Sequence, residues 1–118
     1  MRMSEIQERV MFQTVNDIDD IGDFLPHLDG YINAGYDLLF FAHRGEHPEQ
    51  MLKSGKDVPD LPEWTHGAIA DYATWMIYRN GNVVKQQRGM TFLSSFNEVK
   101  SRITKLSGSI QFVGHLEA

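Results

Sequence analysis

The side chains best suited to metal or acid–base chemistry gather in the middle of the chain. They are three histidines and two glutamates: His43, His47, His66, Glu46 and Glu49. Imidazole nitrogens and carboxylate oxygens are good zinc ligands, so a metal-dependent enzyme that uses this histidine cluster is one hypothesis. The spacing from His43 to His47 also matches the H-x-x-E-H string of inverzincin proteases, which lies on one helix. Here Gly45 interrupts the string and Pro48 follows it, so we treat the match as chance.

A second group of candidate residues is acidic. Four aspartates lie close together in the sequence, at Asp17, Asp19, Asp20 and Asp23. They lack the spacing of a calcium-binding EF-hand, and we interpret them as the solvated start of a helix, where the helix dipole favours carboxylates. Trp64 belongs to a residue type that is enriched at binding hot spots. The hypothesis is that an acidic surface from residues 16–63 meets a partner protein with a basic surface, and these five residues are the predicted contacts.

The positive charges are concentrated in the last part of the chain. Residues 1–71 hold fourteen acidic and five basic side chains, a formal charge of −9, whereas residues 72–118 hold two and six, a formal charge of +4. The six cations are Arg79, Lys85, Arg88, Lys100, Arg102 and Lys105. With nearby aromatic residues, they would suit an RNA- or single-stranded-DNA-binding module that stacks bases on a sheet. The acidic balance of the whole chain and the lack of an RNP-type string oppose that alternative.

Composition bounds the class of protein. A chain of 118 residues with 42% hydrophobic and 23% charged residues predicts one globular domain that spans residues 1–118. The absence of cysteine excludes disulfides, cysteine-ligated zinc and thiol catalysis. The first residues are polar, and the longest apolar run, 38–42, is far too short to span a membrane. We therefore expect a cytoplasmic protein that makes no contact with a membrane.

Hydrophobic spacing predicts two helices. Apolar residues recur every three or four positions over 18–32, which predicts either a helix kinked at Pro26 or two short helices, with the element ending at Gly35. Ser95 and Glu98 have the spacing of a capping box, which predicts the beginning of a second helix.

Several other segments have the composition of strands. Residues 9–15 mix β-branched, aromatic and polar side chains, although a short helix that begins at Ser4 competes there. The apolar run 38–42 predicts a strand buried on both faces. An Asn-Gly pair inside 74–88 predicts a hairpin with a type I′ turn, and residues 110–116 predict a last strand.

The order of these elements predicts the fold class. Residues 45–66 are rich in glycine and proline and predict a long loop that is functional or mobile. The order β-α-β-β-β-α-β predicts an α+β, ferredoxin-like fold with a single, mainly antiparallel sheet and two helices on one face. The alternative is another small α+β fold in which residues 63–73 form a helix.

No sequence motif of high catalytic specificity is present, so the sequence favours a non-catalytic protein without a cofactor. We expect a small acidic binding protein that acts by protein–protein interaction with a basic partner. Inhibitors that occupy the basic groove of a nucleic-acid-binding protein are of this kind, and phage-encoded anti-defence proteins are one group of them. A homodimer formed through an open sheet edge is a further expectation.

Overall fold

The described part of the chain folds into helices alone. The computed structural model describes residues 1–17 and 22–117, with side chains for residues 1–16 and 22–106. The helices are α1 (Met3–Gln13), η1 (Val15–Asp17), η2 (Gly22–His27), α3 (Leu28–Arg44), η3 (Glu63–Thr65), α4 (His66–Tyr78) and α5 (Val83–Glu117). Since no residue in these ranges lies in a strand, the predicted α+β, ferredoxin-like sheet is wrong.

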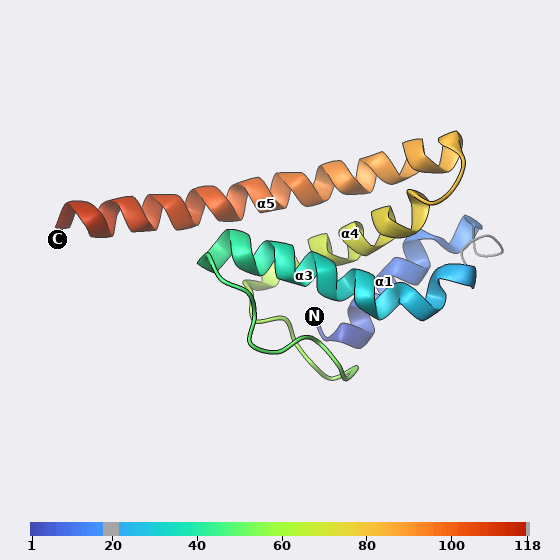
Figure 1. Cartoon of the computed structure of the whole chain (residues 1–118), viewed down its shortest axis with the longest axis horizontal. Helices are drawn as coiled ribbons and strands as arrows, with labels where there is room; N and C mark the ends of the chain where they lie inside the picture. Colours follow the sequence, from blue (N-terminus) through green and yellow to red (C-terminus); the bar gives the residue numbers. More distant parts are fainter. Residues whose placement is uncertain (18–21, 118) are drawn as a thin grey trace.

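Helix α4 lies at the centre of the packing, where it contacts α1, α3 and α5 (Figure 1). A helix that other helices cover on most sides is apolar around most of its circumference. The buried residues of α4 fit that description: His66, Ala68, Ile69, Ala70, Ala73, Thr74, Ile77 and Tyr78. The three alanines are small, which allows the neighbouring backbones to approach closely.

Two glycines on the neighbouring helices make the same close approach possible. A Cβ atom at Gly35 of α3 would lie 3.1 Å from the Cβ of Tyr72 on α4. A Cβ atom at Gly89 of α5 would lie 2.8 Å from the Cβ of Tyr78, which is closer than real Cβ contacts come. These glycines therefore lie where helices cross. The prediction that Gly35 ends a helix is wrong, because Gly35 lies inside α3.

Helix α5 is much longer than the bundle that it covers. Its 35 residues correspond to about 52 Å at 1.5 Å per residue, and it runs along α4 and α3 before continuing past the end of the bundle (Figure 1). Phe96 and Ile103 are buried against the other helices. No helix in the described part of the chain is long and apolar enough to cross a membrane.

Each segment predicted to be a strand lies in a helix. Residues 9–13 belong to α1, which begins at Met3, one residue before the competing helix of the sequence analysis. The apolar run 38–42 is part of α3, where Leu39 and Phe40 are buried and Phe41 is exposed. The apolar side chains of this run therefore point to different sides of α3, and the run does not form a strand. Residues 110–116 lie in α5.

The Asn80-Gly81 pair forms the turn between α4 and α5, not a hairpin. The amide of Gly81 donates to the carbonyl oxygen of Tyr78 at 3.0 Å. A type I′ turn needs a positive φ at both residues, whereas Gly45 is the one described residue with a positive φ. Ser95 lies inside α5, which begins at Val83, so the predicted capping box is also wrong. The alternative helix at 63–73 overlaps η3 and α4.

A polar network joins the end of α1 to α4. The side-chain amide of Gln13 donates to Asp71 Oδ1 at 2.9 Å, and the hydroxyl of Thr74 donates to Gln13 Oε1 at 2.6 Å. Partial burial raises the pKa of Asp71 above its ordinary value, although the Gln13 hydrogen bond and the charge of Arg9 act in the opposite direction. Ionised Asp71 therefore costs folding free energy at neutral pH.

We expect Asp71→Asn to stabilise the protein at pH 7. An asparagine keeps the acceptor for Gln13 and removes the desolvated charge; with solvent screening at this half-buried site, the gain is below about 1 kcal/mol. The folded-state pKa is raised, so the penalty grows as pH rises from the ordinary carboxyl pKa through the raised one. Urea unfolding at pH 7 and at about pH 3 would measure the difference in stability between the variant and the wild type. This difference should vanish below the ordinary carboxyl pKa. Asp23→Asn is the exposed control, and equal stabilisation by this variant would contradict the explanation.

Candidate functional site: an acidic pocket between α3 and the 45–62 loop

The loop 45–62 is fastened to α3 by hydrogen bonds. The side chain of Asn33 makes two of them with the backbone of Leu52: its Oδ1 accepts from the amide at 2.8 Å, and its Nδ2 donates to the carbonyl oxygen at 2.9 Å. Farther along, the amide of Asp60 donates to the hydroxyl of Tyr36 at 3.2 Å. Leu52 and Leu61 are buried in the core. These contacts fix the path of a segment that has no helix or strand of its own.

The loop also covers the beginning of α1. The amide of Met3 donates to the carbonyl oxygen of Asp57 at 2.7 Å, and the amide of Ser4 donates to that of Gly55 at 3.0 Å. Loop carbonyls therefore satisfy two amides that the first turn of a helix leaves free. The Asp57 carboxylate accepts from the amides of Lys53 and Ser54, and these bonds lower its pKa.

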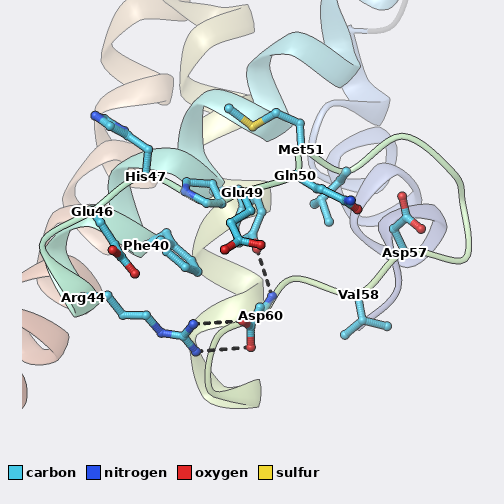
Figure 2. Close-up of a pocket in the computed structure, with 13 residues that line it drawn as sticks. Phe40, Arg44, Glu46, His47, Glu49, Gln50, Met51, Asp57, Val58 and Asp60 are labelled. Atoms are coloured by element: carbon cyan, nitrogen blue, oxygen red, sulfur yellow. Dashed lines mark hydrogen bonds and ion pairs between the residues drawn. The ribbon is translucent and has the colours of Figure 1, made fainter.

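A pocket of about 510 Å³ lies between this loop and α3. Tyr36 and Phe40 on α3 supply an aromatic wall, and Met51 and Val58 supply apolar side chains from the loop. Four carboxylates line the pocket, those of Glu46, Glu49, Asp57 and Asp60. Arg44 and His47 also line it. Figure 2 shows the side chains of Glu46, Glu49 and Asp60 on the side of the pocket where Arg44 projects.

Arg44 is held at the edge of the pocket by two kinds of contact. Its guanidinium donates to both carboxylate oxygens of Asp60, at 2.9 and 3.2 Å (Figure 2). The same group lies 4.7 Å from the centre of the Phe40 ring, in a cation–π contact. The Asp60 hydrogen bonds raise the pKa of Arg44, so this group stays protonated. The pocket therefore already contains one example of a cation bound between a ring and a carboxylate.

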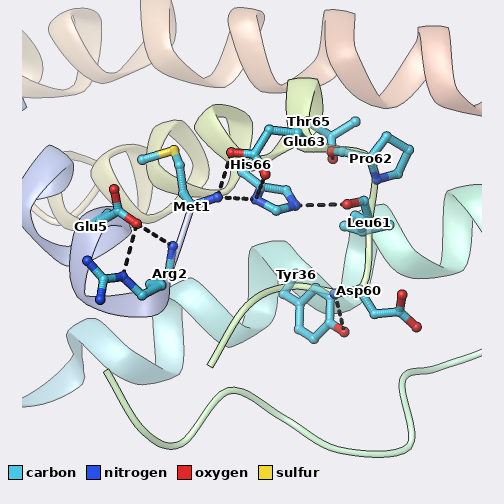
Figure 3. Close-up of polar contacts among 10 residues, drawn as sticks. All are labelled: Met1, Arg2, Glu5, Tyr36, Asp60, Leu61, Pro62, Glu63, Thr65 and His66. Carbon is cyan, nitrogen blue, oxygen red and sulfur yellow. Dashed lines mark hydrogen bonds and ion pairs between the residues drawn. The ribbon is translucent and has the colours of Figure 1, made fainter. Parts of the chain in front are cut away.

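His66 has a structural role in this part of the molecule. It is buried; its Nε2 lies 2.9 Å from the Leu61 carbonyl oxygen, and its Nδ1 lies 2.8 Å from the amino nitrogen of Met1 (Figure 3). Nε2 must therefore carry the proton that it donates to Leu61, while Nδ1 accepts. Glu63 is exposed, and its hydrogen bond to the Met1 ammonium lowers its pKa. His66 thus joins the end of the loop to the beginning of α4.

The three histidines predicted as metal ligands do not come together. Both ring nitrogens of His66 have partners within the protein. His47 is exposed, and its Nδ1 lies 2.7 Å from Asp37 Oδ1. His43 lies in the last turn of α3. Among the described side chains, those of residues 1–16 and 22–106, no group of three or more histidine, aspartate or glutamate residues is placed to hold a metal ion.

Two of the five predicted contacts for a basic partner, Asp23 and Trp64, have described side chains, and these two lie on different elements. Asp23 is exposed in η2, at the other end of α3 from the pocket (Figure 1). Asp19, Asp20 and the side chain of Asp17 lie outside the described residues. Trp64 is 47% exposed, but it lies beside α5 and does not line the acidic pocket. The structure therefore does not bring these five residues into one described site.

The six predicted nucleic-acid contacts lie on or next to one helix. Arg79 directly follows α4, and the other five cations lie along α5: Lys85, Arg88, Lys100, Arg102 and Lys105. The Arg102 guanidinium pairs with Glu98 at 2.9 Å, one turn away on the same helix. The described residues provide no sheet on which aromatic side chains could stack bases, so the ferredoxin-like basis of that alternative is lost.

Comparison with protein families, with curated proteins and with solved structures finds no match to this chain. The residues of the pocket are therefore the basis for any statement about function.

Sequence reasoning missed most of this pocket. Phe40 and Arg44 come from a segment predicted to be a strand, and Asp57 and Asp60 were not singled out within the predicted acidic surface of residues 16–63. A usable signal was present, because Glu46, Glu49, Asp57, Asp60 and Glu63 all fall within the predicted loop 45–66.

We expect Asn33→Ala to destabilise the protein by about 1–3 kcal/mol, because two backbone groups of buried Leu52 lose their partner. Chemical denaturation would measure this loss. Asn97→Ala is the matched control, since exposed Asn97 lies within α5 and gains the same helix propensity without touching the loop. Equal stability of the two variants would show that the Asn33–Leu52 pair does not hold the loop.

Proposed function

We propose that this chain is a non-catalytic binding protein whose acidic pocket receives a cationic segment of a partner protein. The observation that carries the proposal is the lining of the pocket, where four carboxylates accompany Arg44 beside an aromatic wall. A lysine or arginine side chain has an apolar stem and a cationic head. The exposed side chains of Met51 and Val58 suit the stem, and the carboxylates suit the head.

The environment of Arg44 supports the choice of ligand. A guanidinium is bound there by Phe40 and Asp60, and the carboxylates of Glu46 and Glu49 are exposed beside it. A partner arginine or lysine would find carboxylates at Glu46 and Glu49 and exposed apolar side chains at Met51 and Val58. Because these carboxylates are exposed, the attraction acts mainly on the association rate and weakens with salt.

A binding protein of this kind suits inhibition of a nucleic-acid-binding partner. The basic groove of such a partner recognises phosphates, and an acidic surface competes for the same lysines and arginines. A phage-encoded anti-defence protein would use this chemistry, and so would any other acidic inhibitor of a basic groove. The carboxylates of the pocket would select a partner surface by its positive charge.

We expect a fluorescein-labelled nona-arginine peptide to bind the full chain and to bind more weakly in 300 mM than in 50 mM NaCl. Fluorescence anisotropy would give the Kd. The double variant Glu46→Gln/Glu49→Gln should raise the Kd by about three- to tenfold, because each exposed ion pair contributes less than about 1 kcal/mol.

The matched control is Glu8→Gln/Asp23→Asn, which removes two exposed carboxylates away from the pocket and changes the net charge equally. This control should retain most of the affinity. An equal loss in both double variants would mean that the peptide reads net charge alone, and a Kd independent of salt would remove the electrostatic argument. Either result would overturn the assignment of the pocket.

A further inference from the structure

A second surface lies where η3 meets α5. A groove of about 360 Å³ is lined there by Trp64 from η3 and by three residues of α5: Arg102, Lys105 and Leu106. Lys105 and Leu106 follow Arg102 by three and four positions, so the three residues share one face of the helix. None of the lining residues belongs to the acidic pocket, and the two surfaces are therefore separate.

The groove exposes two large apolar side chains. Trp64 is 47% exposed and Leu106 is 53% exposed. Tryptophan is enriched among the residues that supply most of the binding energy of an interface, because a partner removes its large apolar surface from water. A tryptophan and a leucine exposed in one groove therefore favour a ligand with a large apolar side chain.

The charged side chains that line the groove are both cations. Lys105 is exposed and has no ion-pair partner among the described side chains. Exposed Arg102 donates from Nη2 to Glu98 Oε1 at 2.9 Å. A guanidinium has five N–H donors, so Arg102 keeps donors for a second carboxylate. The lining thus offers positive charge and hydrogen-bond donors to an anionic ligand.

The two described carboxylates closest in sequence to these residues are already engaged within the chain. Glu98 accepts from Arg102, as above, and Glu63, which directly precedes Trp64, accepts from the Met1 ammonium at 2.7 Å (Figure 3). Neither glutamate lines the groove. An anionic ligand would therefore meet two cations there and no lining carboxylate.

The same lining is a poor match to single-stranded nucleic acid. Such a ligand needs a track of cations that follows its phosphates, in addition to aromatic side chains on which bases stack. The groove has two cations, and Arg88 and Lys85 lie about 20 Å or more from Arg102 along α5. Half of the lining residues are apolar, which suits a ligand that combines carboxylates with an apolar side chain.

We propose that this groove binds an acidic peptide segment of a partner protein. A large apolar side chain of the segment packs against Trp64 and Leu106, and its carboxylates reach Arg102 and Lys105. Charge complementarity selects the acidic segment, and the apolar contact supplies most of the affinity. The proposal does not depend on the acidic pocket, since the two surfaces share no lining residue.

Fluorescence anisotropy with the full chain tests the apolar part of this proposal. The probe is a fluorescein-labelled nonapeptide of glutamates with leucine and phenylalanine at its centre. We expect saturable binding, and Leu106→Gln should raise the Kd about three- to tenfold because the apolar contact is lost. Met90→Gln is the matched control, since Met90 is 50% exposed near the other end of α5. Leucine, methionine and glutamine have similar helix propensities, so both variants should keep the circular dichroism of the wild type.

The charged part is tested with Lys105→Gln. This variant should raise the Kd about two- to fivefold in 50 mM NaCl and less in 300 mM, because exposed ion pairs are weak and screened by salt. Lys56→Gln is the matched control: it removes an exposed cation of the 45–62 loop and should leave the Kd unchanged. An all-glutamate nonapeptide should bind at least about tenfold more weakly than the probe, because it lacks the apolar anchor.

Four results would overturn the proposal. The first is no saturable binding of the probe by the wild type, and the second is an equal loss of affinity in a variant and its matched control. The third is tighter binding of labelled oligothymidine than of the probe, with the same dependence on Leu106 and Lys105, which would make the groove a nucleic-acid site. The fourth is a dimer in sedimentation velocity that Leu106→Gln dissociates, which would assign the groove to a second copy of the chain.

Discussion

The close covering of α4 by three other helices is the constraint on which the rest of the structure depends. Helices can surround a fourth at short range only if the residues at the crossings are small, and Gly35, Gly89 and the alanines of α4 meet that condition. Within the described residues, no buried side-chain nitrogen or oxygen lacks a hydrogen-bond partner. Burial of an apolar helix and full pairing of the few polar groups around it therefore explain the arrangement of the described helices.

This packing also explains why a loop can form a binding surface. A segment without secondary structure must pair its backbone groups elsewhere, and the 45–62 loop uses Asn33, Tyr36 and the first turn of α1 for that purpose. The loop in turn satisfies free amides of α1, so the two segments support each other. The carboxylates of the pocket are consequently carried by a backbone whose course is set from several sides.

The sequence predicted local features better than the elements that contain them. Glycine and proline located the long loop, and the spacing of apolar residues located helical character before Gly35 and after Ser95. The strand predictions failed at 38–42 and at Asn80-Gly81 for a common reason. A short apolar run fits a buried strand and a buried helix equally well, and an Asn-Gly pair marks a turn without specifying the elements that it joins. The contacts that decide between helix and strand, such as that of Tyr72 with Gly35, join residues that are distant in sequence. The acidic residues of the loop were visible in the sequence, but their place in a pocket was not predictable, because the pocket joins two segments whose contact depends on Asn33 and Leu52.

The charge asymmetry of the sequence takes a spatial form in this fold. The carboxylate-bearing loop lies on one side of the bundle, and α5, with five of the six cations of residues 72–118, lies on the other (Figure 1). The separation matters because charges on opposite sides of a bundle are farther apart than the Debye length of about 8 Å at physiological salt, so they screen each other little. The proposed attraction of a cationic segment requires this separation, because a basic helix beside the acidic pocket would repel the same ligand. The pocket and α5 instead present charges of opposite sign on different sides of one small bundle.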